Sequence, residues 1–301
     1  MKAALGVSAA VALISACATG GNVAYAQPGC DIDAETVAPQ VSDALEAGSA
    51  STNLLMDLTS CLGDPRSEIR DGLAYEVLTS LLRAETVALE DRQWLLQHLS
   101  EGLGADDEGD GYLKPFQALV LGEVARTDRM ERWMSVEQRK ALVETAASYV
   151  EKVSDYRGFI GGEGWRHGVA HGADLLMQLS LNDAIDKADA DRILAAIGAQ
   201  IASHEAPAYI FDEPRRLAQP LLFLTRQGLF IEDELTAWFE RLADPAPLEG
   251  WDEAFWSEKA LARRHNLRAF GYAVLVPATE RPDESLRKLR PGALYLLTNI
   301  P

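Results

Sequence analysis

The stretch "DPRSEIRDGLAYEVLTSLL", residues 64–82, decides the fold class because its apolar residues recur at helical spacing. Asp64 stands directly before Pro65, an arrangement typical of a capped helix with proline in its first turn. Residues three or four positions apart lie on one face of a helix, so the stretch predicts an amphipathic helix. The residues that form this apolar face are Leu73, Val77, Leu78, Leu81 and Leu82.

The same pattern recurs along the chain. "LNDAIDKADADRILAAIGAQI" (181–201) and "FDEPRRLAQPLLFLTRQG" (211–228) carry comparable acidic or proline starts, and no stretch shows sustained period-two alternation. The sequence therefore predicts an all-α protein of about a dozen helices without a significant sheet. A helix pair cannot cover its own apolar face, which favours a HEAT-like α-solenoid or stacked helical pairs. A compact helical bundle is the alternative.

The N-terminal residues are typical of an export signal. Met1 and Lys2 precede the uncharged run "AALGVSAAVALISACA", which is too short to span a bilayer comfortably. Two cleavage sites compete within residues 1–26: cleavage after Ala26, or a lipobox that would make a lipid-modified Cys17 the first residue. We expect an exported, periplasmic protein, either soluble or attached to the membrane through a lipid at Cys17 only. Residues 27–301 are predicted to form a single all-α domain.

Cysteine and charge content agree with this placement. Cys30 and Cys61 remain as an even pair, which predicts a disulfide in an oxidising compartment; two separately buried thiols are the alternative. The formal net charge of -18 repels phosphate backbones, so we expect no nucleic-acid partner.

The stretch "DYRGFIGGEGWRHGVAHGADLL", Asp155–Leu176, carries the candidate chemistry. Four glycines in its first eleven residues predict a loop between a helix that ends near Lys152 and one that starts near Trp165. His167, His171 and Asp174 would then occupy positions i, i+4 and i+7, which share one helix face.

Three interpretations of that face stay open. Imidazoles four residues apart can bind one divalent metal such as zinc, with Asp174 as a third ligand or an orienting group. His167 and His171 can instead line a polar pocket that needs no cofactor, or pack beside the loop and bond to its backbone carbonyls.

Asp155, Arg157 and Trp165 flank the same glycine-rich loop. Arg157 is suited to hold an anionic or hydroxyl group, and Trp165 offers an apolar platform. Alternatively, Asp155 and Arg157 bond to each other and close the loop.

The stretch resembles the signature of the bacterial family called domain of unknown function 2785 (DUF2785), in which a D-x-R-G loop precedes G-W-x-H-x-x-x-H-x-A-D. Further matching segments are "LGDPRSEIRDGLAYEVL", "DEPRRLAQPLL" and "HNLRAFGYAVL". The chain departs from the family at Lys114–Gln117, where the family has an Arg-Ser-Phe-Ser run. The resemblance implies an α-helical, solenoid-like domain without an assigned activity. Its shared polar residues map to Asp155, Arg157, Trp165, His167, His171, Asp174 and Arg216.

These patterns favour an exported binding protein whose polar pocket, around Asp155–Asp174, takes a small polar ligand or a peptide. In it Arg157 would orient the ligand, Trp165 would stack on it, and His167 or His171 would exchange a proton. The alternatives are a metal-dependent hydrolase that uses His167, His171 and Asp174, and a solenoid scaffold for a protein partner. The sequence does not decide whether the protein is an enzyme.

Overall fold

The computed structural model describes residues 30–105, 110–280 and 283–301, and the chain divides into two compact units, Met1–Gln93 and Trp94–Pro301. The boundary falls within helix α5 (Leu89–Gly104). A single domain over residues 27–301 stays a prediction. The predicted export signal, with Cys17 and Ala26, lies outside the described residues.

The first unit is helical and carries the predicted disulfide. Cys30, before α1, is bonded to Cys61 at the end of α2, with a Cα–Cα distance of 4.8 Å. This confirms the predicted pairing. The helices of the unit, besides the start of α5, are α1 (Ala34–Ala47), α2 (Thr52–Ser60), α3 (Ser67–Ile69), the π-helical η2 (Arg70–Tyr75) and α4 (Glu76–Arg83).

The helix predicted from residues 64–82 begins later than its sequence suggests. Asp64 does not cap a helix at Pro65; its carboxylate accepts hydrogen bonds from the backbone N–H (2.8 Å) and Nε (2.9 Å) of Arg66. Helical structure starts at Ser67 and runs through η2 into α4. The predicted apolar face is buried at Leu78, Leu81 and Leu82.

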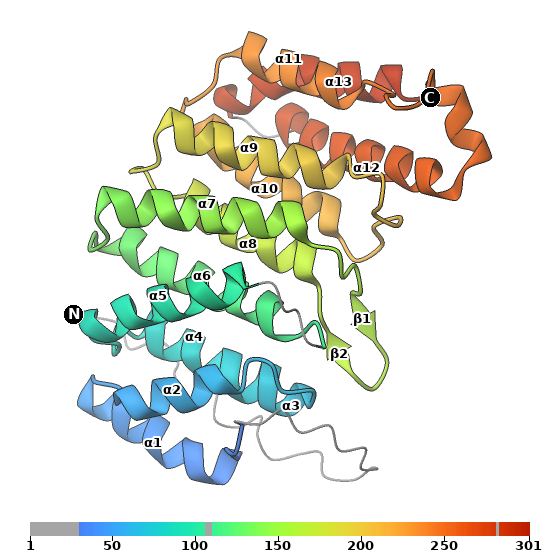
Figure 1. Cartoon of the computed structure of the whole chain (residues 1–301). Coiled ribbons are helices and arrows are strands. Elements are labelled where there is room, and N and C mark those ends of the chain that lie inside the picture. Colours follow the sequence, from blue (N-terminus) through green and yellow to red (C-terminus); the bar gives the residue numbers. More distant parts are fainter. Residues whose placement is uncertain (1–29, 106–109, 281–282) are drawn as a thin grey trace. The chain divides into compact units, whose positions relative to one another are not determined.

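The second unit is all-α apart from one small hairpin (Figure 1). Among the described residues of the whole chain there are thirteen α-helices, and the sheet consists of two strands of two residues each, which confirms the predicted fold class. Beyond α5, the elements of this unit are α6 (Leu113–Met130), α7 (Val136–Lys152), β1 (Phe159–Ile160), β2 (Gly164–Trp165), α8 (Gly168–Ser180), α9 (Lys187–Ile201), α10 (Glu213–Arg226), α11 (Glu232–Leu242), η3 (Trp251–Trp256), α12 (Glu258–Glu280), η4 (Glu284–Leu289) and α13 (Arg290–Asn299).

Local sequence explains where several of these helices begin. Ser135 and Asp186 precede α7 and α9 and form capping boxes. In each box, the side chain of this first residue accepts a hydrogen bond from the backbone N–H of the residue three positions later, and the side chain of that later residue accepts one from the backbone N–H of the first. Pro214 lies in the first turn of α10, where its missing N–H costs no helical hydrogen bond.

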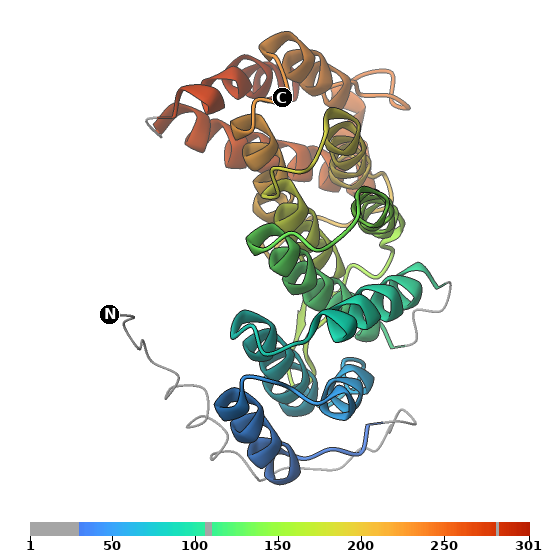
Figure 2. The ribbon, with the colours of Figure 1, turned by 90° about the vertical axis from the view of Figure 1, so that its left-hand side faces the viewer.

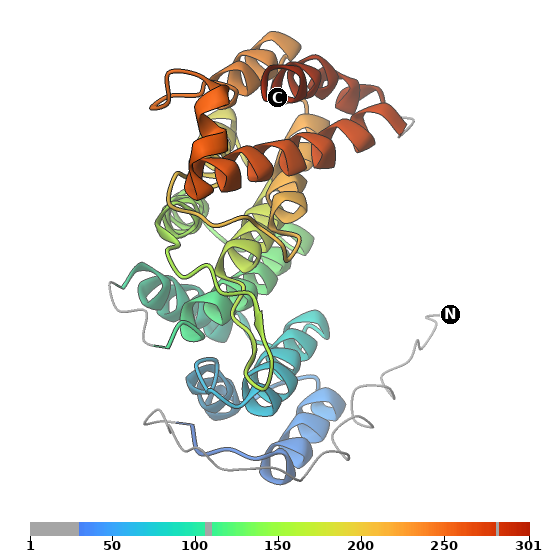
Figure 3. The ribbon, with the colours of Figure 1, turned by 90° about the vertical axis from the view of Figure 1, so that its right-hand side faces the viewer.

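The helices of the second unit stack in two rows. Helices α6, α8, α10 and α12 pack side by side in one row, and α7 packs on α9 in the other. The side views show these rows as adjacent layers of green to orange helices (Figures 2 and 3). Consecutive pairs α7–α8 and α9–α10 contact each other across the layers, so the pairs stack as expected.

Helix α8 occupies the centre of this stack. It contacts α6, α7 and α10, and most of its residues are buried, including the small residues Gly168, Ala170, Gly172 and Ala173. Small side chains let three neighbouring helices approach closely, which explains the composition of this segment. Among the described residues, no helix combines the length and hydrophobicity that a membrane span needs.

Candidate functional site

The glycine-rich loop folds into a short β-hairpin. Strand β1 pairs antiparallel with β2, with Phe159 opposite Trp165. The ladder continues at its base, where the His167 N–H donates to the Arg157 carbonyl (3.0 Å). Gly162 in the turn and Gly164 at the start of β2 take left-handed backbone conformations. Because Trp165 is paired in β2, α8 begins at Gly168, three residues later than predicted, while α7 ends at Lys152 as predicted.

Asp155 and Arg157 bond to each other at the base of the hairpin. Arg157 Nε donates to both carboxylate oxygens of Asp155 (2.8 and 3.0 Å), and its Nη2 donates to the Asp110 carbonyl (3.2 Å). Burial raises the pKa of the Asp155 carboxyl, but the hydrogen bonds and charge of Arg157 outweigh it and hold the pKa below its usual range. The guanidinium closes the loop, yet its side chain stays 48% exposed.

A second arginine, which the sequence reasoning did not select, fixes the hairpin to the start of α6. Arg166 is buried, and its Nη1 pairs with Glu163 Oε2 (2.8 Å). Its guanidinium lies 4.0 Å from the centre of the Tyr112 ring, and the Tyr112 hydroxyl donates to Glu163 Oε2 (3.1 Å). The position in the motif was the only sequence signal for Arg166, because the stacking tyrosine lies more than fifty residues away in the chain.

The aromatic residues of the motif form a continuous column. The Trp165 and His167 rings stack with centroids 4.7 Å apart and an interplanar angle of 22°. His167 lies 5.5 Å from His171, which meets the edge of Phe116 at 5.3 Å. Only the outer end of the column reaches solvent: Trp165 is 37% exposed, whereas both histidines are buried.

Phe159 and Phe211 hold Trp165 from two further directions. Their ring centroids lie 5.2 and 5.8 Å from that of Trp165. Phe211 belongs to the loop between α9 and α10, so the platform depends on two loops that are distant in sequence. An indole held by three rings keeps one orientation before any ligand arrives.

His167 sits at a strained and electrostatically unusual position. Its backbone is left-handed (φ 57°), a conformation that is uncommon for residues other than glycine. Its Nε2 lies 2.9 Å from the Phe211 carbonyl, which can only accept, so Nε2 carries the proton. Burial lowers the pKa of His167, which therefore is neutral at pH 7.

The carboxylate of Glu213 lies beside this imidazole. Glu213 Oε1 is 3.9 Å from His167 Nε2, and Oε2 accepts from the Phe211 N–H (2.8 Å). Burial raises the pKa of Glu213. The preceding residue, Asp212, is left-handed like His167, so α8 and α10 both begin at strained residues that adjoin the same Phe211. Strain and shifted pKa values gather at functional sites more often than elsewhere.

Asp174 and Arg216 form an ion pair between α8 and α10. Burial raises the pKa of Asp174, and the charge of Arg216 works against that rise. The Asp174 carboxylate is therefore engaged by an arginine of the neighbouring helix. Among the described residues, no group of three or more His, Cys, Asp and Glu side chains is arranged to hold a metal ion.

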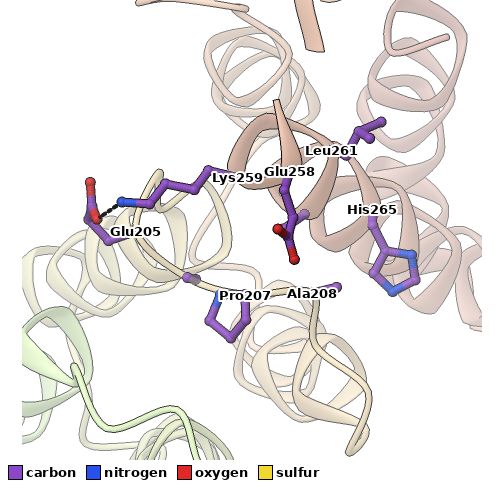
Figure 4. A pocket seen from close by; sticks show the side chains of 9 residues that line it. Glu205, Pro207, Ala208, Glu258, Lys259, Leu261 and His265 are labelled. Carbon is purple, nitrogen blue, oxygen red and sulfur yellow. Dashed lines mark hydrogen bonds and ion pairs between the residues drawn. The ribbon is translucent and has the colours of Figure 1, made fainter. Parts of the chain in front are cut away.

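The seven sequence-predicted residues thus lie in one region of the second unit, around the hairpin and the first turns of α8 and α10. They form three groups: the Asp155–Arg157 pair, the column of Trp165, His167 and His171, and the Asp174–Arg216 pair between α8 and α10. None of the seven lines either of two pockets in this unit, of about 540 and 340 Å³. The larger pocket lies between the α9–α10 loop and α12 (Figure 4), and sequence reasoning missed it.

A family model described as "Protein of unknown function (DUF2785)" matches residues 99–276. The chain belongs to this family. The DUF2785 match runs from α5 into α12 and includes the hairpin, the aromatic column and both pockets. Neither a curated protein nor a solved structure matches the chain.

Proposed function

We propose that this DUF2785 protein is a binding protein whose hairpin recognises a small polar ligand or a peptide segment. The observation that carries the proposal is the stack of a part-exposed Trp165 on the buried His167. A large aromatic face held in one orientation contributes apolar contact area at a low cost in side-chain entropy. Phe159, 51% exposed, widens the apolar surface beside it.

Arginines supply the polar half of the proposed recognition. Among the described residues, Arg157 makes its hydrogen bonds through Nε and Nη2, so its Nη1 remains to donate to a ligand. Arg216 pairs through Nη1 and its side chain is 34% exposed. A guanidinium has five N–H donors, so an arginine already paired with a carboxylate can still meet a carboxylate or hydroxyl of a ligand.

Two contacts support binding over the metal-dependent hydrolase. The Nε2–H of His167 is directed at a backbone carbonyl, which leaves that nitrogen no lone pair for a metal. Asp174, the third ligand of that alternative, pairs with Arg216. His167 therefore supports the platform through its ring stack on Trp165 and its bond to the Phe211 carbonyl.

The test uses Nα-acetylphenylalanine, a probe that joins an aromatic ring to a carboxylate. We expect it to shift the backbone amide resonances of Phe159 and Phe211, which stay visible in every variant, and the indole N–H resonance of Trp165 in a two-dimensional ¹H–¹⁵N NMR titration. The amide-capped probe should bind more weakly. Trp165→Ala should abolish binding, and Arg157→Ala should weaken it about two- to fivefold, the range for an ion pair at a part-exposed site.

Trp256→Ala is the control, because Trp256 is an exposed tryptophan (90%) that lies outside the hairpin. Binding that survives Trp165→Ala, or that Trp256→Ala reduces equally, would contradict the proposed platform. Melting curves of all variants separate loss of binding from loss of folding.

We further propose that the protein is exported, with the mature chain starting after Ala26 or at a lipid-modified Cys17. The Cys30–Cys61 disulfide supports this, because disulfides persist in oxidising compartments. Intact mass measurement of the protein from cell envelopes decides between the two termini. A chain that retains Met1 in the cytosolic fraction would refute export.

A further inference from the structure

The larger pocket, of about 540 Å³, has no role in the proposed platform. It lies between the loop that follows α9 and the first two turns of α12 (Figure 4). The residues that line it are Glu205, Ala206, Pro207, Ala208, Glu258, Lys259, Leu261, Ala262 and His265.

Buried polar contacts fix the wall formed by the loop. Asn266, fully buried on α12, accepts from the Tyr209 N–H (2.7 Å) and donates to the Pro207 carbonyl (2.9 Å). Arg263 on the same helix donates to the Ala202 carbonyl (3.1 Å). The pocket therefore exists before a ligand binds, which lowers the entropy cost of binding.

The rim of the pocket carries two carboxylates, Glu205 and Glu258, and one ammonium group, Lys259. Lys259 extends to Glu205 and forms an ion pair with it, so these two charges compensate each other. The Glu258 carboxylate is directed toward Pro207 and Ala208 in Figure 4, and in the described part of the chain no cationic side chain pairs with it. One negative charge thus remains at the mouth.

The rest of the lining is apolar. Pro207, Ala208, Leu261 and Ala262 form a short surface between Glu258 and His265, which lie two helical turns apart on α12. Two turns span about 11 Å. That length suits an aliphatic chain of several carbons.

We propose that this pocket binds an alkylammonium group, with the aliphatic chain on Leu261 and Ala262 and the cation at Glu258. A lysine side chain of a peptide and a free diamine share this chemistry. The N-terminus of α12 opposes a cation with about half an elementary charge, whereas Glu258 attracts it with a full charge, so attraction prevails. The net charge of -18 further favours the approach of cations.

Two exposed aromatic residues precede the part of α12 that lines the pocket. Phe255 and Trp256 stand directly before α12 and are 54% and 90% exposed. Adjacent large apolar side chains in solvent mark binding surfaces more often than isolated ones do. The Arg264 guanidinium lies over the Phe255 ring, 5.1 Å from its centre, so Trp256 offers the more accessible aromatic face to an ammonium group.

The test is an NMR titration of the whole protein with Nα-acetyllysine methylamide, followed at the amides of Ala206, Ala208 and Leu261. The norleucine counterpart, which lacks the charge, is the control probe. We expect the lysine probe to shift these resonances and the norleucine probe to bind at least threefold more weakly. Glu258→Gln should weaken lysine binding about three- to fivefold, as for a part-exposed ion pair.

Two further variants make the result decisive. Ala208→Trp places a large ring over an exposed lining position and should abolish binding without disturbing the core. Glu280→Gln, the same change at the far end of α12, should leave binding unchanged. Equal binding of both probes, or full affinity in Glu258→Gln, would overturn the proposal.

Comparison of cadaverine with a lysine-containing pentapeptide identifies the source of the ammonium group. Tighter binding of cadaverine assigns the pocket to free amines, and tighter binding of the pentapeptide assigns it to peptides; either result supports the alkylammonium site. Binding of cadaverine or of the pentapeptide at this pocket does not depend on Trp165, so the alkylammonium site and the Trp165 platform can fail separately.

Discussion

Gly172→Ala is expected to destabilise the protein, although alanine is the better helix former. Gly172 lies inside α8, where α7 crosses closely. A Cβ atom there would lie 2.7 Å from Val150 Cγ2 and 3.0 Å from a ring carbon of Tyr149. Carbon atoms prefer about 3.5–4.0 Å, so the two helices would have to move apart. Overpacking costs about 1–3 kcal/mol and alanine gains about 1 kcal/mol in helix propensity, which leaves a net loss of about 1 kcal/mol.

Urea unfolding followed by tryptophan fluorescence measures this loss. All six tryptophans lie in the second unit, so the signal reports the unit that contains α8. Gly122→Ala in α6 is the matched control, because the nearest atoms to a Cβ there are 3.7 Å away, an ordinary contact distance. We expect this variant to gain about 1 kcal/mol. If Gly172→Ala is as stable as Gly122→Ala, close packing of α7 on α8 does not explain the glycine.

Two further predictions concern buried titratable side chains in the second unit. Asp128 is fully buried and accepts hydrogen bonds from Arg139 Nε (2.8 Å), Asn182 Nδ2 (2.9 Å) and two backbone N–H groups, so Asp128→Ala should lower the free energy of unfolding by about 3–5 kcal/mol. Asp183 forms an exposed ion pair, so Asp183→Ala should change the free energy of unfolding by less than about 1 kcal/mol. Similar losses for both variants in urea titrations would refute this expectation. Burial lowers the pKa of His167 in the folded protein below the value of about 6.5 that it has in the unfolded chain. At a pH between the folded and the unfolded pKa, the unfolded chain binds more protons than the folded protein. The free energy of unfolding should therefore fall as the pH decreases from 7 through this interval. Glu213, with its raised pKa, contributes the opposite slope through its own interval, so the comparison is between wild type and His167→Gln; identical pH dependence of the two in urea titrations would contradict the neutral, buried state of His167.

Much of the fold could be predicted because helical signals are local. Apolar spacing, acidic starts and Pro214 located the helices, since each signal acts within one or two turns. The hairpin escaped prediction because two strands of two residues are too short to show alternation. The helix start at Asp64 was wrong for a related reason: the same Asp-Pro pattern suits a turn, and here the Asp64 carboxylate holds Arg66 before the helix begins.

The residues of the candidate site within the motif could also be predicted, whereas their partners in distant elements could not. The motif identified Asp155, Arg157, Trp165 and both histidines, and the open alternative of an Asp155–Arg157 bond is the contact that forms. The partners from other elements could not be predicted. Tyr112 stacks with Arg166, and the Phe211 carbonyl meets His167, across more than forty residues of chain.

The sequence by itself determined the all-α class, the disulfide pairing, the family and the segment that carries the polar motif. Only the tertiary structure decided that Trp165 rests on a neutral His167, that Asp174 faces Arg216, and that a pocket forms where Glu258 approaches the loop after α9. The physical reason is one of range. Helix periodicity and capping depend on neighbours within a few residues, whereas burial, pKa and pocket shape depend on which distant helices the packing of apolar faces brings together.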